Sequence, residues 1–141
     1  MKFTLSKQVK DAINNNKPVL ALESTIISSG MPFPQNIQFQ NKAEKICLDL
    51  GVVPATTAII KGEIHVGLDE KELMHIATDK SVKKISKREI GICLEKKYSG
   101  ATTVSSTSHI AFNAGIKVFS TGGIGGVHRG YDKSLDMSQD I

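Results

Sequence analysis

Apolar residues recur along the chain with two different spacings. Apolar positions three and four residues apart predict helices, whereas short unbroken apolar runs predict buried strands. The predicted helices begin after Ser6, at Pro34 and at Asp69, and two more span residues 87–97 and 102–114. The predicted strands span residues 18–23, 52–61, 64–66, 83–86 and 116–120. Because helices and strands alternate, the sequence predicts an α/β layered fold with a largely parallel sheet.

Local signals refine this prediction in several places. Asp69 and Glu72 have the spacing of a capping box at the start of the third helix. Gly62 predicts a tight turn that joins two strands as a hairpin. Residues 24–33 are rich in hydroxyl side chains and predict a loop. The second helix is expected to bury one apolar stripe, formed by Phe39, Ala43, Ile46, Cys47 and Leu50.

The composition fits one globular domain. The chain has 141 residues, of which 40% are hydrophobic, and this is enough for a single core. It contains five Phe, two Tyr and no Trp, so the core must consist of aliphatic side chains, which suits packed parallel strands. A further secondary-structure element begins shortly before residue 141. Residues 1–141 are therefore expected to form a single, incomplete domain whose sheet exposes an apolar edge.

The charge pattern argues against nucleic-acid and membrane partners. The formal net charge is +4, and the densest basic cluster, Lys83, Lys84, Lys87 and Arg88, has few aromatic residues nearby to stack on bases. A solvated face or an anionic small-molecule site is favoured for this cluster. No stretch approaches the length of a membrane span, and the first residues carry charge too early for a signal peptide.

The cysteines and histidines show no redox or zinc spacing. Cys47 and Cys93 are expected to be buried free thiols in a reducing cytoplasm. His65 and His75 fall within a predicted strand and a predicted helix and are expected to be structural. His128 is the histidine that lies in a site-like context.

The glycine-rich run at residues 121–130 (TGGIGGVHRG) is a candidate anion site. Glycine lets backbone amides approach a ligand closely, and successive amides can form an anion-binding concavity. The run also follows a predicted strand, where open α/β sheets bind ligands. Its spacing matches neither a P-loop nor a GxGxxG fingerprint, so a flexible structural turn is an equal alternative.

A second candidate anion site is the segment 100–108 (GATTVSSTS), which follows a predicted loop and opens a predicted helix. Helix N-termini bind phosphate because their first amides are unpaired and the helix dipole favours anions. Thr102, Thr103 and the amide of Val104 are therefore candidate ligand contacts. A helix start with several capping hydroxyls is the alternative.

Carboxylates supply the remaining candidate chemistry. Glu23 ends a hydrophobic strand, where a carboxyl group suits a general acid. A structural carboxylate bonded to neighbouring hydroxyls is the commoner case. Asp132, Asp136 and Asp140 lie close together in the sequence, and such oxygen ligands suit Mg²⁺ or Mn²⁺. A solvated acidic turn is the alternative for this group.

These segments, taken in order, resemble one family. The resemblance rests on ALESTIISSGMPFPQN, VPATTAIIKGEIHVGL, KKISKREI, GATTVSSTSHIAFNAGIKVFSTGGIGGVHRG and SLDMSQDI. They are similar to the pseudouridine-5'-phosphate glycosidases, also called the indigoidine synthase A-like family, over nearly the whole chain from Pro18 onward. The resemblance implies a three-layer α/β/α sandwich and an enzyme, formally a hydro-lyase, that breaks the C–C bond between uracil and ribose 5-phosphate. It also implies Mn²⁺ or another divalent cation, a phosphorylated C-nucleoside as substrate, and a cytoplasmic homotrimer.

The resemblance further implies roles for individual residues. Glu23 in ALESTI matches the proton donor, and Asp136 in LDMS matches the metal position. The substrate-contacting set is Lys84, Val104, Ser138, Gln139 and Asp140, to which Thr103 is added as a helix-start candidate. The family's nucleophilic lysine, which would form an imine with the opened ribose, lies downstream of these motifs, in a segment outside residues 1–141. A phosphosugar-binding fragment without turnover is therefore the alternative to an active glycosidase.

Overall fold

Seven strands form one mixed sheet in the computed structural model, which describes residues 2–141. They are β1 (Phe3–Leu5), β2 (Val19–Leu22), β3 (Val53–Ile60), β4 (Glu63–Val66), β5 (Lys83–Ile85), β6 (Gly100–Thr102) and β7 (Val118–Ser120). Strands β1, β4, β3, β2 and β7 lie side by side in that order, and β6 connects β3 to β5. Of the strand pairs in residues 2–141, four are parallel, and the pairs β3–β4 and β3–β6 are antiparallel. The predicted mixed, largely parallel sheet is confirmed.

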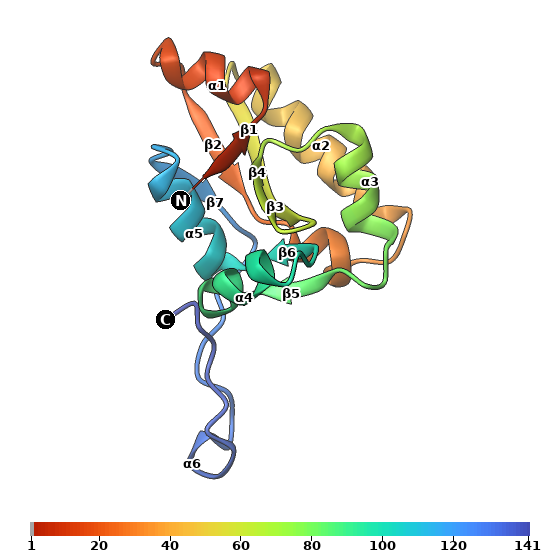
Figure 1. Ribbon diagram of the computed structural model, residues 1–141, viewed down its shortest axis with the longest axis vertical. Coiled ribbons are helices and arrows are strands. Elements are labelled where there is room, and N and C mark those ends of the chain that lie inside the picture. The colour runs from red at the N-terminus through yellow and green to blue at the C-terminus, as the bar shows by residue number, and fades with distance from the viewer. Residues whose placement is uncertain (1) are drawn as a thin grey trace.

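Helices flank this sheet (Figure 1). They are α1 (Lys7–Asn14), a π-helical turn (Ile26–Gly30), α2 (Gln35–Asp49), α3 (Glu70–Thr78), a 3₁₀ turn (Lys87–Glu89), α4 (Ile90–Glu95), α5 (Val104–Asn113) and α6 (Tyr131–Ser134). None of the helices in residues 2–141 combines the length and the apolar character needed to cross a bilayer.

Two separate apolar clusters show that helices cover both faces of the sheet. On one face, Val9 of α1 and Ile110 of α5 pack with Ile59 of β3. On the other face, Ile76 of α3 packs in a cluster that includes Ala58 of the same strand. Neighbouring strand residues point to opposite faces, so adjacent positions of β3 contribute to different clusters. The sheet is thus the middle of three layers.

Several local predictions are confirmed. The Ser6 hydroxyl accepts a hydrogen bond of 3.2 Å from the amide of Val9 and caps α1. Asp69 and Glu72 form the predicted capping box of α3, with bonds of 2.8 and 2.9 Å. Gly62, at φ 81°, lies in the turn that joins β3 and β4 into a hairpin.

The apolar stripe predicted on α2 is buried at Cys47 but is otherwise largely wrong. Three of its members are exposed by 41%, 50% and 75%: Phe39, Ile46 and Leu50. The residues that α2 buries are Asn36, Gln40 and Cys47. The Asn36 amide donates to the carbonyl of Ile27 over 2.8 Å, and the Gln40 amide donates to the Thr56 hydroxyl over 2.6 Å. The helix faces the sheet through polar contacts that depend on distant residues, and a periodicity of apolar positions cannot reveal them.

Three assignments also change. The helix predicted for residues 102–114 begins at Val104, because Gly100–Thr102 form β6. The predicted loop 24–33 contains the π-helical turn. Strand β1 was not predicted, since three residues are too few to show a period. Strands β1 and β6 are stabilised by pairing with neighbouring strands, and their own residues show no pattern that predicts a strand.

Beyond β7 the chain leaves the body of the fold as a projecting arm, residues 121–141, with α6 near its tip (Figure 1). The amide of His128 donates to the carbonyl of Asp136 over 3.2 Å, and the amide of Ser138 donates to the carbonyl of Gly126 over 3.0 Å. These bonds join the outgoing and returning legs of the arm. The returning leg therefore brings residues 136–140 back beside the glycine-rich run.

The apolar sheet edge that the sequence predicts is present at β7. Within residues 2–141, this strand pairs with β2 on one side only. Val118 of β7 is 58% exposed, and Phe112 on the adjacent α5 is 82% exposed. The edge therefore offers unpaired backbone groups next to apolar side chains.

The two cysteines are free and buried, as predicted. Burial raises the pKa of the Cys47 thiol, and the nearby carboxylate of Glu44 raises it further. Burial also raises the pKa of Cys93, against a smaller opposing effect of Lys83. Both thiols are thus held in their unreactive protonated form.

Candidate active site

The carboxyl ends of four strands converge at one place. Strands β2 and β6 pair with the same side of β3 from opposite directions, so their carboxyl ends meet. The amide of Ser24, after β2, donates to the carbonyl of Thr102 in β6 over 3.2 Å. Strand β7 runs parallel to β2, and β5 runs parallel to β6. The loops that follow all four strands therefore face a shared space.

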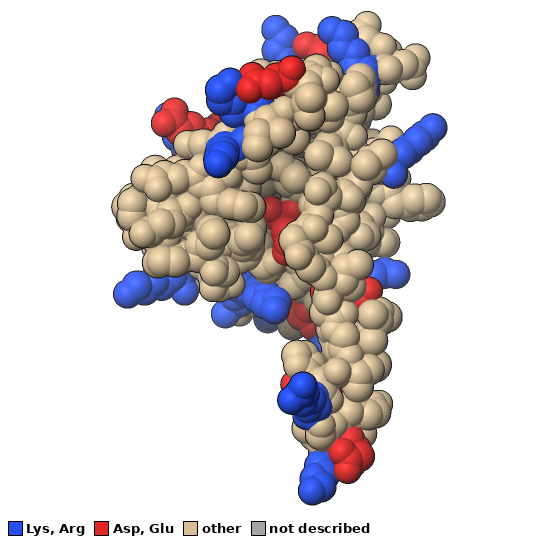
Figure 2. All heavy atoms as spheres, turned by 180° about the vertical axis from the view of Figure 1, so that it is seen from behind, with Lys and Arg blue, Asp and Glu red and all other residues tan. Residues whose placement is uncertain are grey.

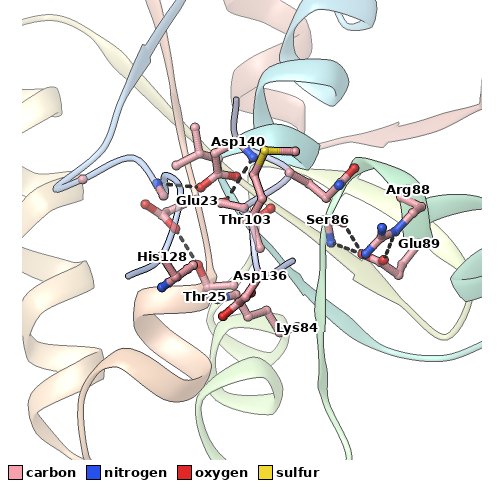
Figure 3. Close-up of a pocket in the computed structure, with 16 residues that line it drawn as sticks. Glu23, Thr25, Lys84, Ser86, Arg88, Glu89, Thr103, His128, Asp136 and Asp140 are labelled. Carbon is pink, nitrogen blue, oxygen red and sulfur yellow. Dashed lines mark hydrogen bonds and ion pairs between the residues drawn. The ribbon is translucent and has the colours of Figure 1, made fainter. Parts of the chain in front are cut away.

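A cavity of ≈ 590 Å³ occupies this space, between the strand ends and the arm (Figure 3). Its lining includes most of the predicted site residues: Glu23, Lys84, Thr103, Val104, Asp136, Ser138, Gln139 and Asp140. Thr102 and Asp132, which were also candidates, are not among the lining residues. The lining also includes Gly123, Gly125 and His128 from the glycine-rich run. Arg129 is not among the lining residues. The structure thus brings together residues that are more than a hundred positions apart.

Glu23 is held by hydroxyl groups at both carboxylate oxygens. The Thr25 hydroxyl donates to Oε2 and the Thr121 hydroxyl donates to Oε1, each over 2.5 Å. Glu23 is half-buried at the end of β2, and Thr121 is the first residue of the arm. The carboxyl group is therefore fixed at the junction of the sheet and the arm, facing the cavity.

A buried network of hydroxyl groups lies beneath Glu23. The Thr102 hydroxyl donates to the carbonyl of Thr57 over 2.8 Å and lies 2.8 Å from the Thr57 hydroxyl. The Thr107 hydroxyl donates to Thr102 over 3.0 Å, and the Ser24 hydroxyl accepts from the Thr102 amide over 2.8 Å. All four residues are fully buried. The prediction that Thr102 contacts a ligand is therefore wrong, because its hydroxyl is used inside the core.

Asp140 joins the arm to the start of α5. Its Oδ1 accepts a bond of 2.9 Å from the amide of Ser105, and its Oδ2 accepts a bond of 3.0 Å from the amide of Gly125. Burial acts to raise the pKa of this carboxyl group, but the two amides and the Ser138 hydroxyl outweigh it and lower the pKa. One amide of the helix N-terminus and one of the glycine-rich run thus bind a carboxylate of the same chain. Binding of a ligand phosphate by these segments stays a prediction.

Positive charge enters the cavity from β5 and the turn that follows it. Lys84 lies in β5, and Arg88 donates to the Glu89 carboxylate over 2.9 Å. The Ser86 hydroxyl and amide also bond to Glu89, and these contacts, the hydroxyl first, lower the pKa of that carboxyl group. Ser86 and Glu89 were not among the predicted site residues. Their serine–x–x–glutamate spacing, typical of a capping box, was the available signal.

The site residues suit a loosely held divalent cation better than a protein-enclosed one. Within residues 2–141, no three His, Cys, Asp or Glu side chains are grouped closely enough to hold a metal. The cavity nevertheless contains four carboxylates, those of Glu23, Glu89, Asp136 and Asp140. Mg²⁺-like cations commonly bind one or two carboxylates, several waters and a ligand phosphate. Asp136 is exposed and can act as such a ligand.

Two predicted structural histidines lie outside the cavity. His65 Nδ1 lies 2.6 Å from the Glu72 carboxylate, and His75 Nε2 lies 2.9 Å from the Ser99 hydroxyl. Both bond to protein groups of the fold, as expected for structural residues. His128, by contrast, lines the cavity together with Glu23 and Thr25 (Figure 3).

Related sequences identify the family of this chain. Residues 8–141 match the family model described as indigoidine synthase A like protein. The pseudouridine-5'-phosphate glycosidase of Alkaliphilus metalliredigens (strain QYMF) is 54% identical over 134 residues, which are 95% of this chain and 44% of that protein. The one from Mycoplasmopsis agalactiae (strain NCTC 10123 / CIP 59.7 / PG2) is 50% identical over 141 residues, which are 100% of this chain and 47% of that protein. The chain spans less than half the length of these relatives.

Two solved structures share the fold of this chain. The prealnumycin C-glycosynthase AlnA, solved in complex with ribulose 5-phosphate, is 40% identical with a TM-score of 0.87, over 98% of this chain and 44% of that chain. An indigoidine synthase A-like protein from Thermotoga maritima is 37% identical with a TM-score of 0.82, over 88% of this chain and 41% of that chain. These matches confirm the fold. Because the family model covers nearly the whole sequence, this chain belongs to the indigoidine synthase A-like family.

Proposed function

We propose that this chain provides part of the active site of a C-glycosidase that converts pseudouridine 5'-phosphate and water into uracil and ribose 5-phosphate. Relatives that carry this name are about half identical to it, and the similar glycosynthase was solved with a phosphosugar bound. The observation that carries the proposal is the convergence of Glu23, Lys84 and the arm residues on one cavity. A structural role explains each of these residues taken alone. It does not explain why all of them meet at the carboxyl ends of the strands.

The cavity suits a phosphorylated sugar. Lys84 and Arg88 supply positive charge for the phosphate group. Thr103, Ser138 and Gln139 supply hydrogen-bonding groups for the sugar hydroxyls. This division of contacts orients the sugar carbon that carries the base toward the carboxyl group at the end of β2.

Val104 and Asp140 complete the proposed substrate-contacting set. Val104 begins α5 and lines the cavity. Both oxygens of Asp140 already accept backbone amides. The main contribution of Asp140 is therefore to hold the arm, with Ser138 and Gln139, against α5.

Glu23 is the proposed proton donor. The elements of water are added across the C–C bond, so the uracil carbon gains a proton and the ribose carbon gains oxygen. Carbon is a poor leaving group, so a positioned acid must supply this proton as the bond breaks. The hydroxyls of Thr25 and Thr121 hold Glu23 for this step. The electron sink on the sugar, an imine in the chemistry that the family resemblance implies, is assigned to no lysine of residues 1–141.

The proposal includes Mn²⁺ or another divalent cation held by Asp136. A bound cation of this kind supplies positive charge beside a phosphosugar. Replacing Asp136 by Asn should weaken Mn²⁺ binding in a calorimetric titration. An unchanged Mn²⁺ affinity would contradict this assignment.

The experiment is an assay of the purified chain with pseudouridine 5'-phosphate and Mn²⁺, in which released uracil is separated and quantified. The comparison uses Glu23→Gln as the test variant and Glu95→Gln, on the outer side of α4, as the matched control. Uracil release that is lost in Glu23→Gln and kept in Glu95→Gln supports the proposal.

A second arm of the experiment measures ribose 5-phosphate binding by NMR, with the amides of Ser105 and Gly125 as reporters. Binding without uracil release favours the alternative, a phosphosugar-binding chain that does not turn over by itself. Failure of both release and binding contradicts the proposed function in either form.

A further inference from the structure

A second cavity, of ≈ 580 Å³, opens at the opposite ends of β5 and β6 from the candidate active site. Val82 and Lys83 line it at the amino end of β5, and Tyr98 and Ser99 line it just before β6. The candidate active site lies beyond the carboxyl ends of the same two strands. The proposed function makes no use of this second cavity.

Lysine side chains dominate the charge of the second cavity. Four lysines line it, Lys61, Lys80, Lys83 and Lys97, together with a single carboxylate, that of Asp79. Among residues 2–141, none of these lysines lies within ion-pair distance of an acidic group. Figure 2 shows Lys and Arg side chains gathered along the lower side of the body of the molecule. A concave surface with unneutralised charge of one sign attracts ions of the opposite sign.

The single carboxylate is already engaged. Asp79 accepts a bond of 2.8 Å from the amide of Ser81 and lies 3.4 Å from the Nδ1 of His75. The Ser81 contacts, the side-chain contact first, lower the pKa of this carboxyl group. Asp79 therefore remains charged without pairing with the lysines, and the cavity keeps a net positive charge.

Two neighbouring turns hold two of these lysines, Lys61 and Lys97, in defined positions. Lys61 and Lys97 both have left-handed backbone conformations, at φ 48° and 53°, which non-glycine residues adopt rarely. The turns are bonded to each other, since the amide of Gly62 donates to the carbonyl of Tyr98 over 2.9 Å and the amide of Lys61 donates to the Ser99 hydroxyl over 3.1 Å. This arrangement fixes where the two lysine side chains begin.

The remaining lining suits phosphate oxygens. The ammonium group of Lys83 lies 5.0 Å from the centre of the Tyr98 ring, a cation–π contact that orients the lysine. The Lys80 ammonium provides a further donor. A concave surface with one aromatic ring fits a small anion better than a strand of nucleic acid, which needs a groove with several stacking rings.

We propose that this cavity is a second ligand site and that it binds a small anion with two or more phosphate charges. The second cavity is the more positively charged of the two, as binding of such an anion requires. The candidate active site contains four carboxylates beside Lys84 and Arg88, whereas the second cavity contains four lysines beside one carboxylate. Lys83 and Lys84 are neighbours on β5, and because side chains alternate along a strand, each lines a different cavity.

This alternation provides a sharp test with inorganic pyrophosphate as the probe. The chain is labelled with ¹⁵N and titrated with pyrophosphate, and the amide signals of Ser81 and Ser99 report on the second cavity. The test variant is Lys80→Gln with Lys83→Gln, and the matched control is Lys84→Gln, one residue further along the same strand. All three lysines are exposed, so the spectra of the variants should otherwise overlay that of the wild type.

The expected result is a saturable shift of the Ser81 and Ser99 signals in the wild type and in Lys84→Gln. In the double variant the dissociation constant should rise about tenfold, as the loss of two exposed ion pairs predicts. Raising the salt concentration should weaken binding in parallel.

Three results would overturn the proposal. The first is the absence of saturable shifts at Ser81 and Ser99 in the wild type. The second is an equal affinity in the double variant, which would show that the signals respond to binding elsewhere, such as near Ser105 and Gly125. The third is a response to a short oligoribonucleotide but not to pyrophosphate, which would assign the surface to nucleic acid. None of these results depends on whether the chain releases uracil.

Discussion

The Thr121 hydroxyl donates a hydrogen bond of 2.5 Å to Glu23 Oε1, although the two residues are 98 positions apart in the sequence. Thr121 is the first residue of the arm, and Glu23 directly follows β2. The bond therefore couples the placement of the arm to the orientation of the proposed proton donor. The other carboxylate oxygen is held by Thr25, which follows in the same chain segment.

Replacing Thr121 by Val removes one of the two hydroxyl donors with little change in shape. We expect kcat for uracil release to fall about tenfold with KM little changed, because a less constrained acid transfers its proton less efficiently. Steady-state kinetics with pseudouridine 5'-phosphate separates the two constants. Thr121→Ser keeps the hydroxyl and should keep most of the rate. An equal loss in both variants would show that the methyl group matters and the hydrogen bond does not.

The attachment of the arm through Asp140 should depend on pH. The folded-state pKa of this carboxyl group lies below its ordinary value of 3.8. Its contribution is therefore fully present above pH 3.8 and is lost as the pH falls through the lower, folded-state pKa. NMR signals of the Ser105 and Gly125 amides should move in this acidic window. Asp140→Asn should abolish that transition, and a transition that persists in this variant would assign it to another group.

Gly125 should tolerate no side chain. A Cβ atom at this position would lie 2.3 Å from the Ser138 hydroxyl and 2.6 Å from its Cβ. We expect Gly125→Ala to push the returning leg of the arm away and to weaken ribose 5-phosphate binding about tenfold. Gly126→Ala is the matched control, because a Cβ there has no neighbour within 4 Å. Calorimetric titration of both variants measures the difference, and equal affinities would contradict the prediction.

The hydroxyl network under Glu23 should contribute to stability. Thr102→Val replaces a fully buried hydroxyl and leaves the Thr57 and Thr107 hydroxyls without their shared partner. The free energy of unfolding should fall by about 1–3 kcal/mol. Urea denaturation followed by circular dichroism measures this change. Ser108→Ala, on the exposed side of α5, should change the value by less than about 0.5 kcal/mol.

The exposed edge at β7 should lead to self-association. Val118 and Phe112 place apolar side chains beside unpaired backbone groups. We expect light scattering after size-exclusion chromatography to show a mass that rises with concentration. Val118→Lys should shift the protein toward the monomer, whereas Ile92→Lys, at an exposed apolar position on α4, should not. A monodisperse monomer at every concentration would contradict this expectation.

Much of the local structure follows from interactions between residues that are close together in the sequence, so it can be predicted from the sequence. The Ser6 cap, the Asp69–Glu72 capping box and the turn at Gly62 depend on residues a few positions apart, so each could be predicted without a structure. Strand β3 is equally predictable from the sequence, because its β-branched and apolar residues are typical of a buried strand. The residue types of the site, a carboxylate after β2 and a glycine-rich run after β7, were visible for the same reason.

The tertiary structure alone decided how these pieces meet. No periodicity shows that β2 and β6 approach each other along one side of β3, yet this topology places Glu23 above the Thr102 network. The return of the arm, which lets Asp140 bond to both Ser105 and Gly125, is likewise a contact between distant segments. By itself, the sequence determined the strands, the caps and the chemical groups, because those depend on neighbouring residues. Their convergence on one cavity depends on the pairing of strands far apart in the chain, which only the folded structure decides.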